Sequence, residues 1–102
     1  MRKKMKRRPT HPGELLREET LPAVGLSQAE LADRLGVSRR TVNDLVHERR
    51  SVNPDLAHRL ARVLDTTPEF WLRLQEAVNV WETLQANRDE YDRLKPLRYR
   101  AA

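Results

Sequence analysis

Residues 27–45 of the chain read SQAELADRLGVSRRTVNDL, and they carry the start and stop signals of two short helices separated by a tight turn. Ser27 and Glu30 have the spacing of a capping box, in which each side chain accepts a hydrogen bond from the other residue's backbone N–H. Gly36 stands where a glycine in the left-handed conformation ends a helix, and Ser38 is positioned to cap the next one. The segment therefore predicts a helix-turn-helix, a motif whose second helix enters the major groove of DNA.

The predicted second helix begins with side chains that suit contacts to DNA. Arginine forms paired hydrogen bonds with guanine, and asparagine forms them with adenine. Arg39, Arg40 and Asn43 all fall in the first turn and a half of this helix. Phosphates are contacted by polar and basic side chains around such a motif, including those of the preceding helix and the following loop. The candidate DNA-binding residues are Gln28, Ser38, Arg39, Arg40, Thr41, Asn43, Arg49 and Arg50.

An ordinary helical hairpin with a solvated arginine face is the alternative interpretation of this segment. The capping box, the Gly36 turn, the small Ala32 and the basic start of the second helix occur together, so DNA binding is favoured. Asp44 lies among the candidates but would be repelled by phosphate. We expect its carboxylate to point away or to accept a hydrogen bond from a cytosine amino group.

The composition agrees with a small domain that binds a polyanion. The chain has 102 residues, a formal net charge of +5 and a sequence pI near 10.2. This balance favours nucleic acid as a partner without proving it. The absence of cysteine excludes disulfides, zinc–thiolate sites and thiol catalysis, and no apolar run reaches the roughly 18–20 residues needed to span a bilayer. We therefore expect a cytoplasmic protein with no membrane, metal or cofactor requirement.

The rest of the chain predicts further helices and no strand, so the expected fold class is all-α. Five helices of a repressor-like domain are predicted. One begins at Pro12 and is broken by Pro22 and Gly25, two form the helix-turn-helix, and two begin at Pro54 and Pro68.

Composition divides the chain into three parts. Residues 1–9 form a basic arm, expected to be flexible, which either adds phosphate or minor-groove contacts or has no specific role. Residues 10–84 form the helix-turn-helix domain with a C-terminal interface helix, and residues 85–102 form a charged tail or an extension of that helix. Met5 leaves open whether translation begins there or at Met1.

A broad apolar stripe runs along the last predicted helix. Such a stripe usually packs on the domain's own core, but Leu72 and Val80 extend this one around the helix. Part of it is therefore expected to pack inward and part to meet another subunit. A two-fold dimer would also place two reading helices about 34–36 Å apart, which is one turn of DNA. The candidate dimer or partner interface consists of Phe70, Trp71, Leu74, Val78 and Trp81.

Three segments carry a family resemblance. HPGELLREE at 11–19, NPDLAHRLA at 53–61 and TPEFWLRLQ at 67–75 resemble HigA-type antitoxins of the Xre/Cro-like helix-turn-helix group, and the resemblance covers about residues 11–84. It implies a five-helix repressor-like fold and a homodimer that binds an operator in its own promoter. It also implies a protein partner, a HigB/RelE-like ribonuclease toxin that the complex inhibits. The basic arm and the segment after residue 84 depart from the family pattern.

Two other functions are alternatives at this point. The first is a stand-alone Xre-family transcriptional regulator with the same DNA chemistry and no toxin; a neighbouring reading frame for a small basic ribonuclease-like protein would favour the antitoxin instead. The second is a nuclease that uses His11, His47 and His58. These histidines have no metal-ligand spacing and offer no visible catalytic triad, so the sequence predicts that the chain is not an enzyme.

Overall fold

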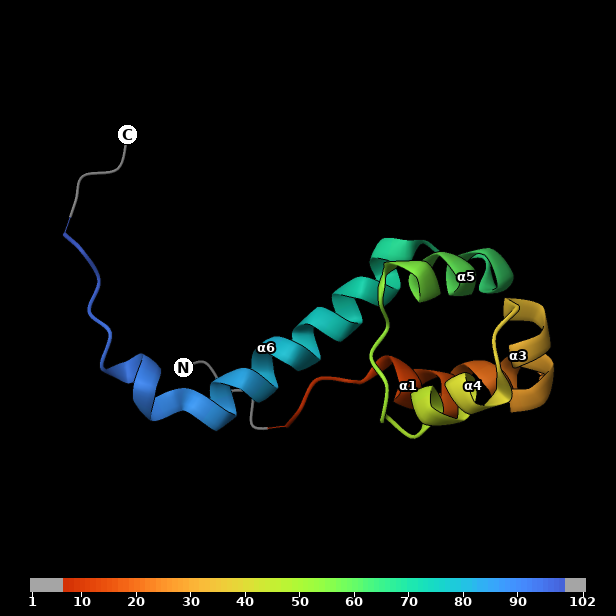
Figure 1. The fold of residues 1–102 in the computed structure, drawn as a ribbon, viewed down its shortest axis with the longest axis horizontal. Helices are drawn as coiled ribbons and strands as arrows, with labels where there is room; N and C mark the ends of the chain where they lie inside the picture. The colour runs from red at the N-terminus through yellow and green to blue at the C-terminus, as the bar shows by residue number, and fades with distance from the viewer. Residues whose placement is uncertain (1–6, 99–102) are drawn as a thin grey trace.

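The computed structural model describes residues 7–98, and all regular secondary structure in that range is helical (Figure 1). Its elements are α1 (Pro12–Leu15), η1 (Leu16–Thr20), α2 (Leu21–Val24), α3 (Gln28–Leu35), α4 (Arg39–Val46), α5 (Pro54–Leu64) and α6 (Pro68–Asp92). Because α1, η1 and α2 follow one another without a gap, the described chain has five separate helices, and the predicted all-α fold is confirmed. Residues 1–6 of the basic arm lie outside the described residues, as do residues 99–102.

The first helix is longer than the sequence predicts. It continues through Pro22 to Val24 and ends at Gly25, which adopts the left-handed conformation (φ 75°). A proline has no N–H to donate and normally breaks a helix interior. Here the preceding residues form the π turn η1, in which the Leu21 N–H donates to the Leu16 carbonyl five residues back. The prediction of a break at Pro22 is therefore wrong, because the π turn places the proline in the first turn of α2, where its missing N–H is tolerated.

The capping signals of the helix-turn-helix are confirmed. Ser27 Oγ accepts from the Glu30 N–H at 3.1 Å, and Glu30 Oε1 accepts from the Ser27 N–H at 2.8 Å. Gly36 ends α3 with φ 72°. At the start of α4, Ser38 Oγ accepts from the Thr41 N–H at 3.0 Å. Each of the two helices therefore begins on a side-chain cap.

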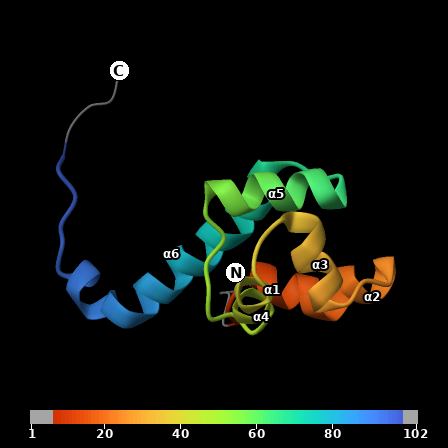
Figure 2. The same ribbon diagram turned by 45° about the vertical axis from the view of Figure 1, so that its right-hand side comes forward.

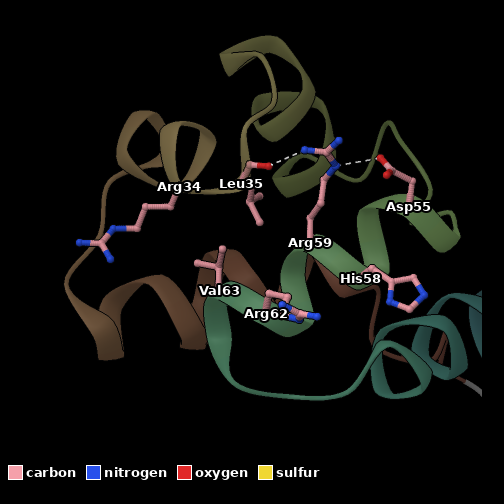
Figure 3. Close-up of a pocket in the computed structure, with 7 residues that line it drawn as sticks. All are labelled: Arg34, Leu35, Asp55, His58, Arg59, Arg62 and Val63. Carbon is pink, nitrogen blue, oxygen red and sulfur yellow. Dashed lines mark hydrogen bonds and ion pairs between the residues drawn. The ribbon is translucent and has the colours of Figure 1, made fainter.

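Caps also fix the later helices. The side chains of Asn53 and Thr67 cap α5 and α6. Arg59 on α5 donates from Nη1 to the Leu35 carbonyl at 2.8 Å and from Nε to Asp55 at 2.9 Å (Figure 3). The last carbonyls of a helix have no partner within it, so Arg59 both satisfies the end of α3 and ties that helix to α5.

The core lies where the first helix, α3, α4 and α5 meet the first turns of α6. A single cluster of buried side chains contains Leu16, Leu31, Val42, Leu45, Val46, Leu60 and Trp71. Helix α1 approaches α4 closely, because a Cβ at Gly13 would lie 1.8 Å from the Leu45 carbonyl oxygen. Only a residue without a side chain permits this approach, which sets the position of α4 against the first helix.

Helix α6 gives the molecule its elongated shape, with principal extents of 53 × 30 × 26 Å. Its first turns pack on the core, and its second half extends away from the other helices in both views (Figures 1 and 2). The backbone leaves the helical region at Asn87 (φ −127°, ψ 21°), and the helix ends at Asp92. The last turns of α6 therefore fall within the segment after residue 84.

His11 caps the first helix from a buried position. Its Nδ1 accepts a hydrogen bond from the Gly13 N–H at 2.9 Å, and the residue is 4% exposed. Burial lowers the pKa of His11 below its ordinary value of 6.5; the Glu48 carboxylate opposes this shift and the Arg8 charge adds to it. The imidazole is therefore held in its neutral form, in which Nδ1 can accept.

Stability is expected to fall as the pH drops below about 6.5. Because the pKa of His11 is lowered in the folded protein, the unfolded chain binds a proton there more readily than the folded one, so protons favour unfolding. His11→Asn removes the titrating group and retains an N-cap acceptor. Urea denaturation at about pH 7.5 and 5.5 should show a smaller loss of unfolding free energy in the variant than in the wild type. An equal loss in both proteins would contradict this origin.

Candidate DNA-binding interface

Helix α4 presents its two arginines to solvent. Arg39 and Arg40 are exposed, and 88% of the Arg40 side chain is accessible. The opposite side of the helix is anchored by Val42, Leu45 and Val46, which are buried in the core. Both arginines therefore extend outward from a helix whose other face is fixed.

Ser38 and Thr41 lie together at the N-terminus of α4. In addition to the hydrogen bond by which Ser38 caps α4, the hydroxyl oxygens of Ser38 and Thr41 lie 2.9 Å apart. The first N–H groups of a helix and its dipole favour an anion at this end. The pair is therefore placed where a phosphate of the DNA backbone could approach.

A polar network joins three predicted residues from three different elements. Asn43 on α4 donates from Nδ2 to Gln28 Oε1 on α3 at 3.2 Å, and its Oδ1 accepts from Arg49 Nη2 in the following loop at 3.0 Å. The Asn43 carbonyl also lies 2.8 Å from His47 Nδ1. The sequence indicates Gln28, Asn43 and Arg49 for different reasons. In the structure, Gln28 and Arg49 both form hydrogen bonds with the side chain of Asn43.

Asp44 supports this network in a way that the sequence analysis missed. Its carboxylate accepts from Arg49 Nη2 at 3.2 Å and lies 3.6 Å from Arg40 Nε. Its carboxylate thus pairs with two of the candidate arginines, Arg40 on α4 and Arg49 in the following loop. The signal in the sequence was the i,i+4 spacing of Arg40 and Asp44, which brings opposite charges together on a helix.

The loop after α4 is held to α6 by another residue that sequence reasoning missed. Gln75 is 4% exposed; its Oε1 accepts from the Val52 N–H at 2.9 Å, and its Nε2 donates to Asn79 Oδ1 at 3.1 Å. A glutamine among the apolar residues of a helix was the available signal, since buried polar groups need partners. Arg49 and Arg50 are exposed in the loop that Gln75 anchors.

The candidate interface on α6 divides into core and surface. Trp71 and Val78 are each 1% exposed within the single chain. The structure corrects the prediction for these two residues, because both side chains are already covered by their own chain. Leu74 is half-buried against the core, Trp81 is half-buried, and Phe70 is 41% exposed.

Apolar side chains are exposed further along α6. Ala77 and Val80 are exposed, Val80 to 63%, and Leu84 is half-buried. Their spacing of three and four residues places them on one side of the helix. The buried indole N–H of Trp81 has no acceptor among the described residues. Ala77 and Val80 are therefore apolar residues of α6 that the described part of the chain leaves exposed.

The structure also bears on the metal and membrane expectations. Within residues 7–98, no group of three or more His, Cys, Asp or Glu side chains is placed to hold a metal ion. His11 is a buried cap, whereas His47 and His58 are exposed. In the same part of the chain, no helix combines the length and the apolar character needed to cross a membrane.

Known proteins are similar to this chain in sequence and in fold. A family model described as helix-turn-helix matches residues 16–71, more than half of the chain. Antitoxin HigA-1 of Vibrio cholerae serotype O1 is 41% identical over 95 residues, which are 93% of this chain and 90% of that protein. The uncharacterized HTH-type transcriptional regulator YbaQ of Escherichia coli K12 is 45% identical over 80 residues, 78% of this chain and 71% of that protein.

A solved structure extends the likeness to three dimensions. The structure of the Pseudomonas aeruginosa antitoxin HigA with the higBA promoter matches with a TM-score of 0.84 at 43% identity, and the match covers 88% of this chain and 99% of that one. The family model, the sequence identity and the fold agree. The chain therefore belongs to the HigA-type antitoxins of the Xre/Cro-like helix-turn-helix family.

Proposed function

We propose that this chain represses its own operon by binding an operator and neutralises a HigB/RelE-like ribonuclease toxin. The observation that carries the DNA-binding part is one polar surface, formed by exposed Arg39 and Arg40 and by the network around Asn43. The solved HigA structure with its promoter supports this part. The toxin-binding part is supported by membership of the antitoxin family.

Base recognition falls to the exposed face of α4. Arg39 and Arg40 reach guanine edges or nearby phosphates in the major groove. Asn43 is suited to adenine through its amide, which Gln28 and Arg49 orient. Because the Asn43 amide is already oriented in the free protein, complex formation costs less side-chain entropy.

Phosphate contacts flank this face on both sides. Ser38 and Thr41 lie at the N-terminus of α4, where helix N–H groups bind a phosphate. Gln28 approaches the backbone from α3, and Arg49 and Arg50 approach it from the loop after α4. These contacts fix the register of α4 on the duplex.

The promoter of the chain's own gene tests the proposed DNA binding. Fluorescence anisotropy at fixed salt should show binding to this fragment at least about a thousandfold tighter than to a scrambled fragment of equal composition. Equal affinity for the two fragments would argue against operator recognition.

A stand-alone transcriptional regulator is the second candidate, favoured by the 45% identity to YbaQ. Affinity purification of the tagged protein from its native cell, followed by mass spectrometry, separates the two. A co-purifying ribonuclease-like protein encoded beside this chain supports the antitoxin, and the absence of both that protein and its reading frame supports the regulator. Under either candidate we infer a cytoplasmic binding protein rather than an enzyme.

We infer that the DNA-bound form is a homodimer joined through the exposed apolar surface of α6. Ala77, Val80 and Leu84 form that surface, with Phe70 and Trp81 as further candidates. Contiguous exposed apolar surface is a mark of interaction sites. A two-fold axis at α6 can place two α4 helices in successive major grooves, about 34–36 Å apart.

Val80→Asp is expected to convert the dimer to a monomer. Val80 is 63% exposed in the single chain, so a carboxylate is tolerated there in water but is costly when buried in an interface. Sedimentation equilibrium should give twice the 12.0 kDa chain mass for the wild type and one chain mass for the variant. Ala86→Asp places the same charge at an exposed position on the opposite side of α6 and serves as the control. A dimeric Val80→Asp protein would place the interface elsewhere.

A further inference from the structure

Glu48 joins separate parts of the chain beside the reading helix. It follows the His47 cap of α4 and adopts a left-handed backbone conformation (φ 63°), which residues other than glycine rarely do. Its carboxylate is hydrogen-bonded to Arg8 through Oε1 and to both Nη atoms of Arg17 through Oε2 at 3.2 Å. Burial raises the pKa of Glu48, but the hydrogen bonds from Arg8 and Arg17 outweigh burial and hold the pKa below its ordinary value. The group is therefore a carboxylate at neutral pH, matched to two guanidinium groups.

This cluster of Arg8, Arg17 and Glu48 also reaches the C-terminal end of α4. Arg17 donates from Nη1 to the carbonyl of Val46, the last residue of that helix. Immediately after Glu48, the Arg49 N–H donates to the Asp44 carbonyl at 2.7 Å. The cluster therefore acts on the backbone at the point where it turns from the reading helix toward Arg49.

A weaker connection runs from the cluster to α6. Arg8 donates from Nη1 to Glu82 Oε2 at 3.0 Å, and half of the Glu82 side chain is exposed, compared with 20% of the Glu48 side chain. Exposed ion pairs contribute little, so Glu48 is the main partner of Arg8. Arg8 and Glu48 of the cluster contribute to the walls of a polar cavity of about 160 Å³, together with Arg49, Arg50 and Glu82.

We propose that Glu48 is a positioning residue for operator binding, which acts by holding the loop that carries Arg49 and Arg50. The proposal rests on the proposed DNA-binding function. The direction of the expected change in DNA affinity distinguishes this positioning role from a simple electrostatic effect. Removing a negative charge near a phosphate-binding surface should strengthen DNA binding if charge alone mattered, whereas loss of positioning weakens it.

Operator affinity measures the positioning effect. Glu48→Gln should weaken binding to the promoter fragment about tenfold, the size of a lost hydrogen bond to a charged group. Glu48→Gly should do the same and retains the fold, because glycine adopts a positive φ without strain. Glu19→Gln removes an equal charge from an exposed position on η1 and should leave affinity unchanged. In an Arg49→Ala, Arg50→Ala background, Glu48→Gln should cause little further loss, because it acts through those two arginines.

Hydrogen exchange in the DNA-free protein gives a readout that does not depend on the proposed function. The Arg49 amide should exchange about tenfold faster in Glu48→Gln than in the wild type, while the amide of Leu31 in α3 stays protected. An unchanged Arg49 amide would overturn the proposal whether or not the protein binds its promoter. Unchanged or tighter operator binding by both Glu48 variants would overturn it as well, as would a full additional loss in the Arg49→Ala, Arg50→Ala background. Failure of the wild type to select its promoter would instead count against the proposed function.

Discussion

Replacing Arg39 or Arg40 by alanine is expected to weaken operator binding by about 1–3 kcal/mol for each arginine that contacts a base. Both side chains extend from the exposed face of α4, so neither change removes a core contact. Alanine is also the strongest helix former, so α4 should persist. Anisotropy titrations should show the promoter complex weakened more than the scrambled-DNA complex, because base contacts contribute only to the specific one.

Arg88→Ala is the matched control for these two variants. It removes the same charge from an exposed position on the half of α6 that extends away from α4 (Figure 1). Its operator affinity should stay close to that of the wild type. Equal weakening by all three substitutions would mean that the arginines act through net charge alone. Unchanged binding of an Arg39→Ala, Arg40→Ala double variant would show that α4 is not the reading helix.

Trp71→Ala is expected to lower the free energy of unfolding by about 3–5 kcal/mol, the range for removing a large buried aromatic side chain. Trp71 is 1% exposed, and its Nε1 donates to Thr66 Oγ1 at 2.7 Å. The substitution removes that hydrogen bond and leaves a cavity between α6 and the core. Urea denaturation followed by circular dichroism measures the loss, and for a small domain it is a large part of the total stability.

Phe70 supplies the control, because it is the adjacent residue and 41% exposed. Its ring packs edge-on against Trp71 with centroids 5.0 Å apart. Phe70→Ala should therefore cost clearly less stability than Trp71→Ala. If Trp71→Ala kept its stability but lost its dimer mass in sedimentation, the side chain would belong to an interface and the assignment to the core would be wrong.

Helix starts were the most predictable part of this fold. The caps at Ser27 and Ser38 form as predicted, and α5 and α6 begin at Pro54 and Pro68, as predicted. A cap is made by residues two or three positions apart, so its chemistry is visible in a short window. Pro22 shows the limit of such rules, because the π turn before it lets the helix continue.

The sequence predicts the candidate site only in part, because several of its contacts join residues that are far apart in the chain. Helical periodicity indicates that Arg39, Arg40 and Asn43 share a region of α4. It gives no sign that Gln28 or Arg49 would orient the Asn43 amide. The contact between Arg8 and Glu48 spans 40 positions, and no local pattern marks a pair so far apart.

Phe70 and Trp71 are neighbours in one apolar stripe, and composition cannot tell which of them is covered. Local chemistry was sufficient to predict the helices and to select α4 and its arginines as candidates for DNA contact, since caps, turns and periodicity depend on nearby residues. Tertiary packing divided α6 into core and surface, placed Glu48 and Gln75 at the loop after α4, and joined Asn43 to its partners. These outcomes depend on contacts between distant segments, whose free energies are set only when the helices come together.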